Sequence, residues 1–214
     1  FVRHDIRSPF TNTALLTEIG QVDYIVHFAA ETHVDRSIEG PGIFVETNVL
    51  GTLHVLELAR QMKNLKAFVQ ISTDEVYGPA KQGETHTEWD PMRPSNPYAA
   101  SKVGADALVL AWVRTYGLRA FIVRTMNNIG ERQDPEKFVP HTIRAMCMNK
   151  RVTIHGNRHV IGSRCWIHPR NFASGVMFLM LGHGTPGEIY HIAGEELTNL
   201  QVAEIIADEL NVPL

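Results

Sequence analysis

The sequence predicts an α/β fold built on a doubly wound parallel sheet that is incomplete at its N-terminal side, followed by a smaller α/β region. Apolar runs rich in β-branched residues alternate with helical patterns through residue 124. Several of these runs are continuously apolar, as in strands that are buried on both faces. After about residue 150 the elements become shorter and less regular. We therefore expect a first domain over residues 1–150 and part of a second over 151–214.

The expected elements follow from capping residues and apolar periodicity. Asn12 or Thr11 caps a short helix that Gly20 ends. In the first region, strands are expected over residues 22–28, 67–71 and 118–124, with helices over 41–62 and 98–116. Residues 1–7 are interpreted as the end of a strand. In the second region we expect strands over 152–155, 164–167 and 188–193, and helices over 171–181 and 200–210.

Composition excludes several classes of function. With 214 residues, 44% of them hydrophobic, the chain can bury a core, and a net charge of −3 without a basic stripe argues against a nucleic-acid partner. The longest apolar stretches are too short to cross a membrane. Two cysteines without metal-ligand spacing indicate a reduced, cytoplasmic protein. Eleven histidines show no metal-binding spacing, so no metal is expected.

The most informative stretch lies at the end of the apolar run over residues 67–71. It continues as S-T-D-E-V-Y-G, from Ser72 to Gly78, and Y-A-A-S-K follows from Tyr98 to Lys102. Catalytic groups in such sheets lie just beyond the carboxyl ends of the strands. Tyr98 and Lys102 are four residues apart in a helical pattern, so they share one helix face, where an ammonium can stabilise a phenolate.

These two motifs together resemble the extended short-chain dehydrogenase/reductase family, whose first domain is a Rossmann-like fold. The pair Asp74-Glu75 after Thr73 resembles the nucleotide-sugar 4,6-dehydratases of that family, most of all the branch that acts on dTDP-glucose. A tyrosine and a lysine at this spacing occur often by chance, but their conjunction with the acidic pair is specific. The alternative from the residues alone is a surface turn with two solvated carboxylates.

The resemblance implies a lyase that binds NAD and a nucleotide sugar and makes a 4-keto-6-deoxy product. Tyr98, Lys102 and Thr73 then serve hydride transfer at C4 of the sugar. Asp74 and Glu75 serve the elimination of water, Glu75 as base and Asp74 as acid. The alternatives are an epimerase or decarboxylase of the same family, which uses no carboxyl pair, or a non-catalytic remnant that binds a nucleotide sugar.

The resemblance also implies binding residues. For the cofactor they are Tyr98, Lys102, Asp5, Ile6, Phe28, Ala29, Ala30, Glu31, Thr32, Thr47 and Asn128. For the sugar nucleotide they are Thr32, Thr73, Asn127, Lys137, Phe138, Thr153, His155, Arg164 and Asn199. His33, Asp35 and Arg36 are interpreted as a network that fixes a loop.

The sequence departs from the family pattern at several positions. His4 and Ile129 stand where the family commonly has Gly and Tyr, and Cys165 stands where it has Asp. The stretch over residues 157–163 is also about two residues longer than the family's hairpin. The departures at Cys165 and in this stretch concern the choice of nucleotide and sugar and not the type of reaction.

Two further expectations concern assembly and extent. The helices over 41–62 and 98–116 are apolar over more than one narrow stripe, and family members commonly form homodimers through the matching pair. The residues expected to contribute are Phe44, Val45, Leu108, Leu110, Trp112 and Val113. No Gly-rich phosphate-binding turn is found in the sequence. We therefore expect a fragment of a longer polypeptide that binds NAD weakly or not at all when isolated.

Overall fold

The computed structural model describes residues 1–80, 83–154 and 162–214. They form two compact units, residues 1–125 with 175–192 and residues 126–174 with 193–214. The chain thus leaves the first unit after Thr125 and returns to it at Gly175. The expected functional boundary near residue 150 stays a prediction.

The first unit contains a four-stranded parallel sheet, which confirms the predicted fold class. Its strands are β1 (Tyr24–His27), β2 (Ala67–Thr73), β3 (Ala120–Thr125) and β6 (Ile189–Ile192), in the spatial order β1-β2-β3-β6. In β2 all residues but Ile71 are buried. A strand covered on both faces needs apolar side chains on both, which explains the continuous run in the sequence.

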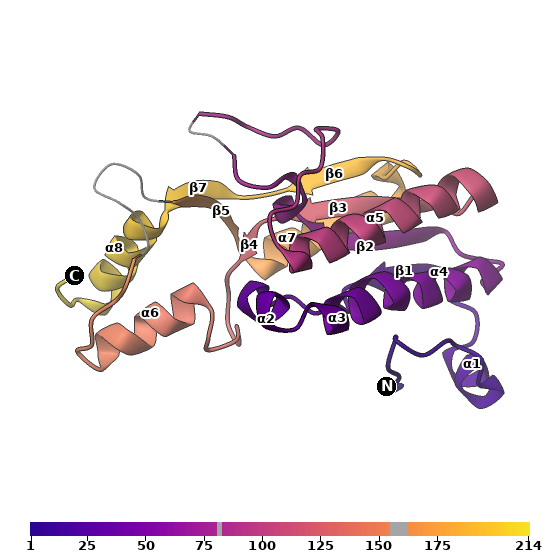
Figure 1. Cartoon of the computed structure of the whole chain (residues 1–214), viewed down its shortest axis with the longest axis horizontal. Coiled ribbons are helices and arrows are strands. Elements are labelled where there is room, and N and C mark those ends of the chain that lie inside the picture. The colour runs from indigo at the N-terminus through magenta and orange to yellow at the C-terminus, as the bar shows by residue number, and fades with distance from the viewer. Residues whose placement is uncertain (81–82, 155–161) are drawn as a thin grey trace. The chain divides into compact units, whose positions relative to one another are not determined.

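Several helical elements accompany this sheet. Along the chain they are α1 (Thr13–Ile19), α2 (Val34–Glu39), α3 (Pro41–Phe44), the π-helical turn η1 (Val45–Leu50), α4 (Gly51–Gln61) and α5 (Pro97–Tyr116). Helices α3, α4 and α5 lie together on one face of the sheet (Figure 1). As predicted, Asn12 caps α1 by accepting the backbone N–H groups of Ala14 and Leu15. Gly117 ends α5 in the left-handed conformation that favours glycine.

The core of the first unit lies between this helical layer and the sheet. Leu56 of α4, Phe68 of β2, Val109 of α5 and Ile122 of β3 are completely buried in one cluster. Each such side chain contributes roughly 1.5–3 kcal/mol through its burial. The core therefore fixes α5 against β2 and β3, and with it the residues at the start of α5.

The second unit is built on a three-stranded mixed sheet. Strand β4 (Asn127–Asn128) pairs in parallel with β5 (Ser163–Ile167), and β7 (Glu195–Thr198) pairs with β5 in antiparallel orientation. Helices α6 (Phe138–Cys147) and α8 (Asn199–Leu210) pack beside it, around Trp166, Met146 and Ala203. Helix α7 (Pro169–Phe178) begins in the second unit and ends in the first. The turn η3 (Leu179–His183), which follows α7, belongs to the first unit.

Two expected strands are wrong. Residues 1–7 form no ladder hydrogen bonds with a strand of the described structure, and Asp5 bonds instead to the nearby Arg7. Residues 152–154 are also irregular, although β-branched residues favour an extended chain. A segment with high β-propensity forms a strand only when it also pairs with another strand. Strands β4 and β7 were not expected, because each is too short to give a clear periodic signal.

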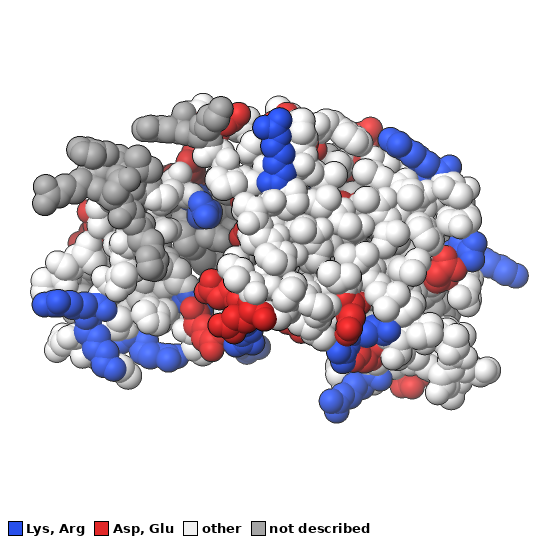
Figure 2. All heavy atoms as spheres, viewed as in Figure 1, with Lys and Arg blue, Asp and Glu red and all other residues white. Residues whose placement is uncertain are grey.

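The expected homodimer stays a prediction, with one residue corrected. Phe44 is buried, with its ring edge toward Tyr98 at a centroid distance of 6.4 Å, so it does not offer a surface to a partner. Val45 is 54% exposed. Leu108, Leu110, Trp112 and Val113 are only partly buried against the core. The face of the molecule over α4 and α5 carries few charged side chains (Figure 2), since Lys102 and Asp106 of α5 are buried.

No helix of the described residues is long and apolar enough to span a membrane. The location of the protein in the cell stays a prediction.

Candidate active site

Three of the predicted catalytic residues lie at the carboxyl end of β2. Thr73 ends the strand, and Asp74 and Glu75 begin the 3₁₀ turn η2 (Asp74–Tyr77). The Thr73 hydroxyl donates to Asp74 Oδ1 at 3.2 Å and accepts the Glu75 backbone N–H at 3.3 Å. The threonine therefore caps the turn and fixes the backbone from which the two carboxylates project.

The turn is held in its position by the end of the loop over residues 78–96. The Arg93 backbone N–H donates to the Val76 carbonyl oxygen at 2.9 Å. Gly78 has a φ of +77°, and a Cβ atom there would meet the Arg93 carbonyl oxygen. This close approach explains the glycine in D-E-V-Y-G, because the loop and the turn leave no space for a side chain.

Asn96 joins the acidic pair to the helix that carries Tyr98. Its Oδ1 accepts the Ala99 backbone N–H at 2.8 Å and caps α5, and its Nδ2 donates to Glu75 Oε2 at 2.8 Å. Asn96 was not among the predicted site residues. An Asn followed by Pro97 at a helix start is a typical capping signal. The sequence thus indicated the cap, but the bond to Glu75 depends on the tertiary fold.

Tyr98 lies beside Thr73. Its side chain is buried, and its hydroxyl is hydrogen-bonded to the Thr73 side chain. Burial raises the pKa of Tyr98 above its ordinary value. The Thr73 hydrogen bond lowers this pKa, whereas the carboxylates of Glu75 and Asp74 raise it further. The phenol form is therefore strongly favoured at neutral pH.

Lys102 lies one helical turn beyond Tyr98 and is also buried. Its Nζ donates to the Ile71 carbonyl oxygen at 2.7 Å. Burial lowers the pKa of Lys102, and the Asp106 carboxylate opposes this shift. In this structure the Lys102 ammonium is bonded to Ile71, and burial has the largest effect on the pKa of Tyr98. The expectation that Lys102 lowers the pKa of Tyr98 stays a prediction.

Asn48 ties the end of β1 to the same helix. Its Oδ1 accepts the Glu31 backbone N–H at 2.8 Å, and its Nδ2 donates to the Glu31 carbonyl oxygen at 2.9 Å and to Ser101 Oγ at 2.8 Å. Asn48 is buried in the π-helical turn η1. Its polarity in an otherwise apolar stretch was a signal in the sequence, but neither Asn48 nor Ser101 was predicted as a site residue.

The predicted cofactor residues of the first unit are distributed over three segments. Phe28, Ala29, Ala30, Glu31 and Thr32 follow β1 directly, and Thr47 is in η1. Phe28 is 58% exposed. Asp5 and Ile6 lie in the N-terminal segment, where the Ile6 carbonyl oxygen is 2.8 Å from His54 Nδ1 of α4. Arg7 holds the pKa of the Asp5 carboxyl at about 2, chiefly through their side-chain hydrogen bond.

A buried polar cluster lies behind the predicted catalytic residues. Asp106 Oδ2 accepts hydrogen bonds from the Ser72 hydroxyl at 3.0 Å and from Arg124 Nη2 at 3.0 Å. Arg124 Nη1 also donates to the Tyr77 hydroxyl at 2.6 Å. Burial raises the pKa of Asp106, while Arg124 and Lys102 oppose the shift. The cluster connects β2, β3, η2 and α5 around one charge pair.

The predicted cofactor and substrate residues of the second unit make mostly local contacts. Asn127 and Asn128 form β4, and Asn128 Nδ2 donates to the Met126 carbonyl oxygen at 3.4 Å. Lys137 precedes α6, and Phe138 begins it and packs against Trp166. Arg164 is exposed on β5, and its Nη1 donates to the Ser163 carbonyl oxygen. Asn199 begins α8, Thr153 is exposed, and His155 and most of the expected hairpin lie outside the described residues.

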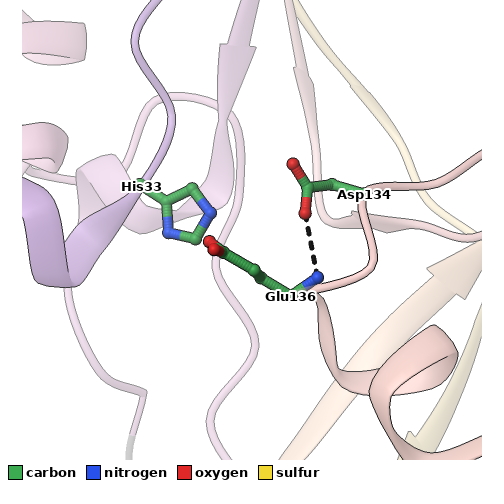
Figure 3. A group of neighbouring side chains, drawn as sticks. All are labelled: His33, Asp134 and Glu136. Atoms are coloured by element: carbon green, nitrogen blue, oxygen red, sulfur yellow. Dashed lines mark hydrogen bonds between the residues drawn. The ribbon is translucent and has the colours of Figure 1, made fainter. Parts of the chain in front are cut away.

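The second unit also has a largely apolar surface pocket of about 450 Å³ between α6 and β5. It is lined by Ile129, Gly130, Glu131, Val139, Ile143, Trp166, Ile167 and His168. None of the predicted site residues that the structure describes lines it. In the turn before α6, the Glu136 backbone N–H donates to Asp134 Oδ1 at 2.9 Å (Figure 3). His33, which is also drawn there, belongs to the first unit.

The parallel sheet, with Thr73 at a strand end and Tyr98 and Lys102 in the next helix, defines the class of short-chain dehydrogenase/reductase folds. A family model described as GDP-mannose 4,6 dehydratase matches residues 1–213. The chain belongs to this family of nucleotide-sugar dehydratases.

Individual relatives agree with this assignment. The chain is 43% identical over 213 residues to the dTDP-glucose 4,6-dehydratase of Streptomyces antibioticus, and the match covers 99% of this chain and 61% of that protein. The crystal structure of the dTDP-glucose 4,6-dehydratase DesIV from Streptomyces venezuelae, with NAD bound, matches all of this chain and 64% of its own. Its TM-score is 0.88 at 41% identity. The NAD complex of UDP-glucose 4-epimerase from Thermus thermophilus has a TM-score of 0.86 at 27% identity, over 99% of this chain and 69% of its own.

The chain spans about three fifths of the length of the curated relatives that it matches.

Proposed function

We propose that the protein catalyses the NAD-dependent dehydration of a nucleoside-diphosphate hexose to a 4-keto-6-deoxy sugar. One observation carries the proposal. The acidic pair Asp74-Glu75 is linked to the Tyr98 helix on both sides, through Thr73 and through Asn96. Hydrogen bonds thus connect Tyr98, the proposed base for the sugar hydroxyl, with the two carboxyl groups proposed for elimination. A reaction with two proton-transfer stages requires both kinds of group in one site.

The chemistry follows from the residue types. Tyr98, as phenolate, takes the proton of the C4 hydroxyl, which Thr73 orients by a hydrogen bond. The 4-keto group acidifies the C5 proton, and Glu75 removes it. Asp74 protonates the C6 hydroxyl, which leaves as water. Lys102, one turn from Tyr98, is the cation proposed to favour the phenolate once its bond to Ile71 is exchanged.

The residues at the end of β1 fit a dinucleotide. Exposed Phe28 is followed by two alanines, so a flat ring can lie close to the backbone at the sheet edge where such folds bind nucleotides. When bound, NAD would supply the acceptor for the C4 hydride and the donor of a hydride to C6, and Glu75 would return a proton to C5. Of the relatives, DesIV and the Thermus thermophilus epimerase were crystallised with NAD. By this proposal Phe28 to Thr32, Thr47, Lys102 and Asn128 hold the cofactor, with Asp5 and Ile6 at its far end.

The sugar nucleotide is proposed to bind through the second unit. Arg164 is exposed, and its guanidinium matches the oxygens of a diphosphate. Asn127, Lys137, Phe138 and Asn199 complete the proposed set. The relatives' names support a dTDP-linked glucose as the first substrate to test.

The test compares two variants in the full-length protein with NAD and dTDP-glucose. Glu75→Gln is expected to abolish dehydration yet retain some C4 oxidation, seen as reduced-cofactor absorbance. Tyr98→Phe is expected to abolish oxidation itself, at a cost of about 10²-fold or more for a lost acid–base group. Dehydration is measured by the alkaline absorbance of the 4-keto-6-deoxy product.

The same assay separates the alternatives. A C4 epimer as product identifies an epimerase, and full turnover by Glu75→Gln contradicts the role of the acidic pair. Binding of the nucleotide sugar without any turnover identifies a non-catalytic protein.

A further inference from the structure

Asn96 occupies an unusual position for a helix cap. One side-chain amide serves two groups, since its oxygen caps α5 and its nitrogen donates to Glu75 Oε2 at 2.8 Å. The capped N–H belongs to Ala99, the residue directly after Tyr98. The same side chain therefore sets the first turn of the Tyr98 helix and one oxygen of the Glu75 carboxylate.

The surroundings of Glu75 make this contact important. The Glu75 backbone N–H donates to Thr73 Oγ1. Within the described residues, the hydrogen bond from Asn96 Nδ2 is the one that links the Glu75 carboxylate to the rest of the protein. Glu75 is only partly buried, so water competes for its oxygens. Without the amide donor, the Glu75 side chain is free to adopt other rotamers.

We propose that Asn96 is a positioning residue that aims the Glu75 carboxylate and couples it to the Tyr98 helix. This inference rests on the proposed function. It predicts that loss of the amide donor slows the elimination of water while leaving C4 oxidation intact, because Tyr98 keeps its capped helix and its bond to Thr73.

The matched variant is Asn96→Ser. Serine caps helices about as well as asparagine but has no amide to reach Glu75. In single-turnover experiments with NAD and dTDP-glucose, we expect reduced cofactor to form within about twofold of the wild-type rate. Elimination, followed by deuterium exchange at C5 and by product absorbance, is expected to slow roughly 10- to 100-fold, the usual loss for a hydrogen bond to a charged group.

Further variants separate this role from capping. Asn96→Asp keeps the cap and the size but presents an acceptor to Glu75, so it is expected to slow elimination at least as much as Asn96→Ser. Asn96→Asp also tests the proposal if the Asn96→Ser variant does not fold. Asn12→Ser makes the same exchange at the cap of α1, away from the predicted catalytic residues, and is expected to change neither step.

Two results overturn the inference. One is elimination of water at the wild-type rate by both Asn96→Ser and Asn96→Asp. The other is an equal slowing of oxidation and elimination, which indicates a cap and nothing more. If instead the wild-type protein forms no dehydrated product, the proposed function fails, and the coupling is then judged by stability. In urea unfolding, the double variant Asn96→Ser/Glu75→Ala is expected to lose less stability than the sum of the single variants, and additive losses contradict the coupling.

Discussion

The polar residues of the two units are held in different ways. In the first unit, Thr73, Asp74, Glu75 and Tyr98 are bonded to one another or to a shared neighbour, and a fully buried charge pair lies behind them. In the second unit, Arg164 is exposed and bonds to the backbone of the adjacent residue. Acid–base groups need their geometry before the reaction begins, whereas a residue that binds a flexible diphosphate can adjust when the ligand arrives.

The largest effect that tests this contrast is expected at Arg124. Its side chain is 1% exposed, and its partner Asp106 is completely buried. Arg124→Met leaves the Asp106 charge without its partner, so we expect a loss of about 3–5 kcal/mol in the free energy of unfolding, measured by urea denaturation. The double variant Asp106→Leu/Arg124→Met is expected to recover part of the loss.

Arg164→Met in the second unit is the matched control. Because the Arg164 side chain is exposed, we expect this substitution to change the free energy of unfolding of the protein by less than about 0.5 kcal/mol. Equal losses for the two arginines would contradict the comparison between the units.

The second prediction concerns pH and His27. His27 is buried in β1, its Nε2 is 3.2 Å from Thr52 Oγ1, and burial lowers its pKa from 6.5 to about 4. Between these values the unfolded chain binds the proton more readily, so the stability from neutral His27 is complete above the unfolded pKa and is lost as pH falls toward 4. The loss is about 3 kcal/mol at most.

This loss is measured as the free energy of urea unfolding between neutral pH and about pH 4. His27→Asn is expected to flatten the dependence, because it removes the titrating group. His141→Asn, at an exposed position of α6, is the control and is expected to leave the slope unchanged. If the slope is the same in wild type and His27→Asn, groups other than His27 cause the acid sensitivity.

The smallest of the three effects is expected at Arg164, and it appears in binding. Arg164→Ala removes the proposed diphosphate partner, which is worth about 1.5–3 kcal/mol and raises KM for dTDP-glucose roughly 10- to 100-fold. We expect kcat to be nearly unchanged, since the predicted catalytic residues belong to the first unit. Arg144→Ala, an exposed arginine of α6, should alter neither constant. A fall in kcat without a change in KM would contradict the diphosphate role.

Much of the first unit was predictable from local patterns. The continuous apolar runs indicated β2 and β3, and Asn12 and Gly20 marked the two ends of α1. The sequence failed where a strand depends on a partner far along the chain. Residues 152–154 have the β-propensity but pair with no strand of the described residues. The two residues of β4 do pair, with Trp166 and Ile167, although they show no visible periodicity.

The sequence by itself thus determined the fold class, the family and the residues of the acidic motif, because these depend on residue type and on spacing along one element. Only the tertiary structure decided that Asn96 bonds Glu75, that Asn48 joins Glu31 to Ser101, and that Lys102 donates to Ile71. These contacts join residues that lie 17 to 53 positions apart in the sequence. Periodicity and propensity describe neighbours along the chain, whereas a hydrogen bond between side chains depends on how two elements pack.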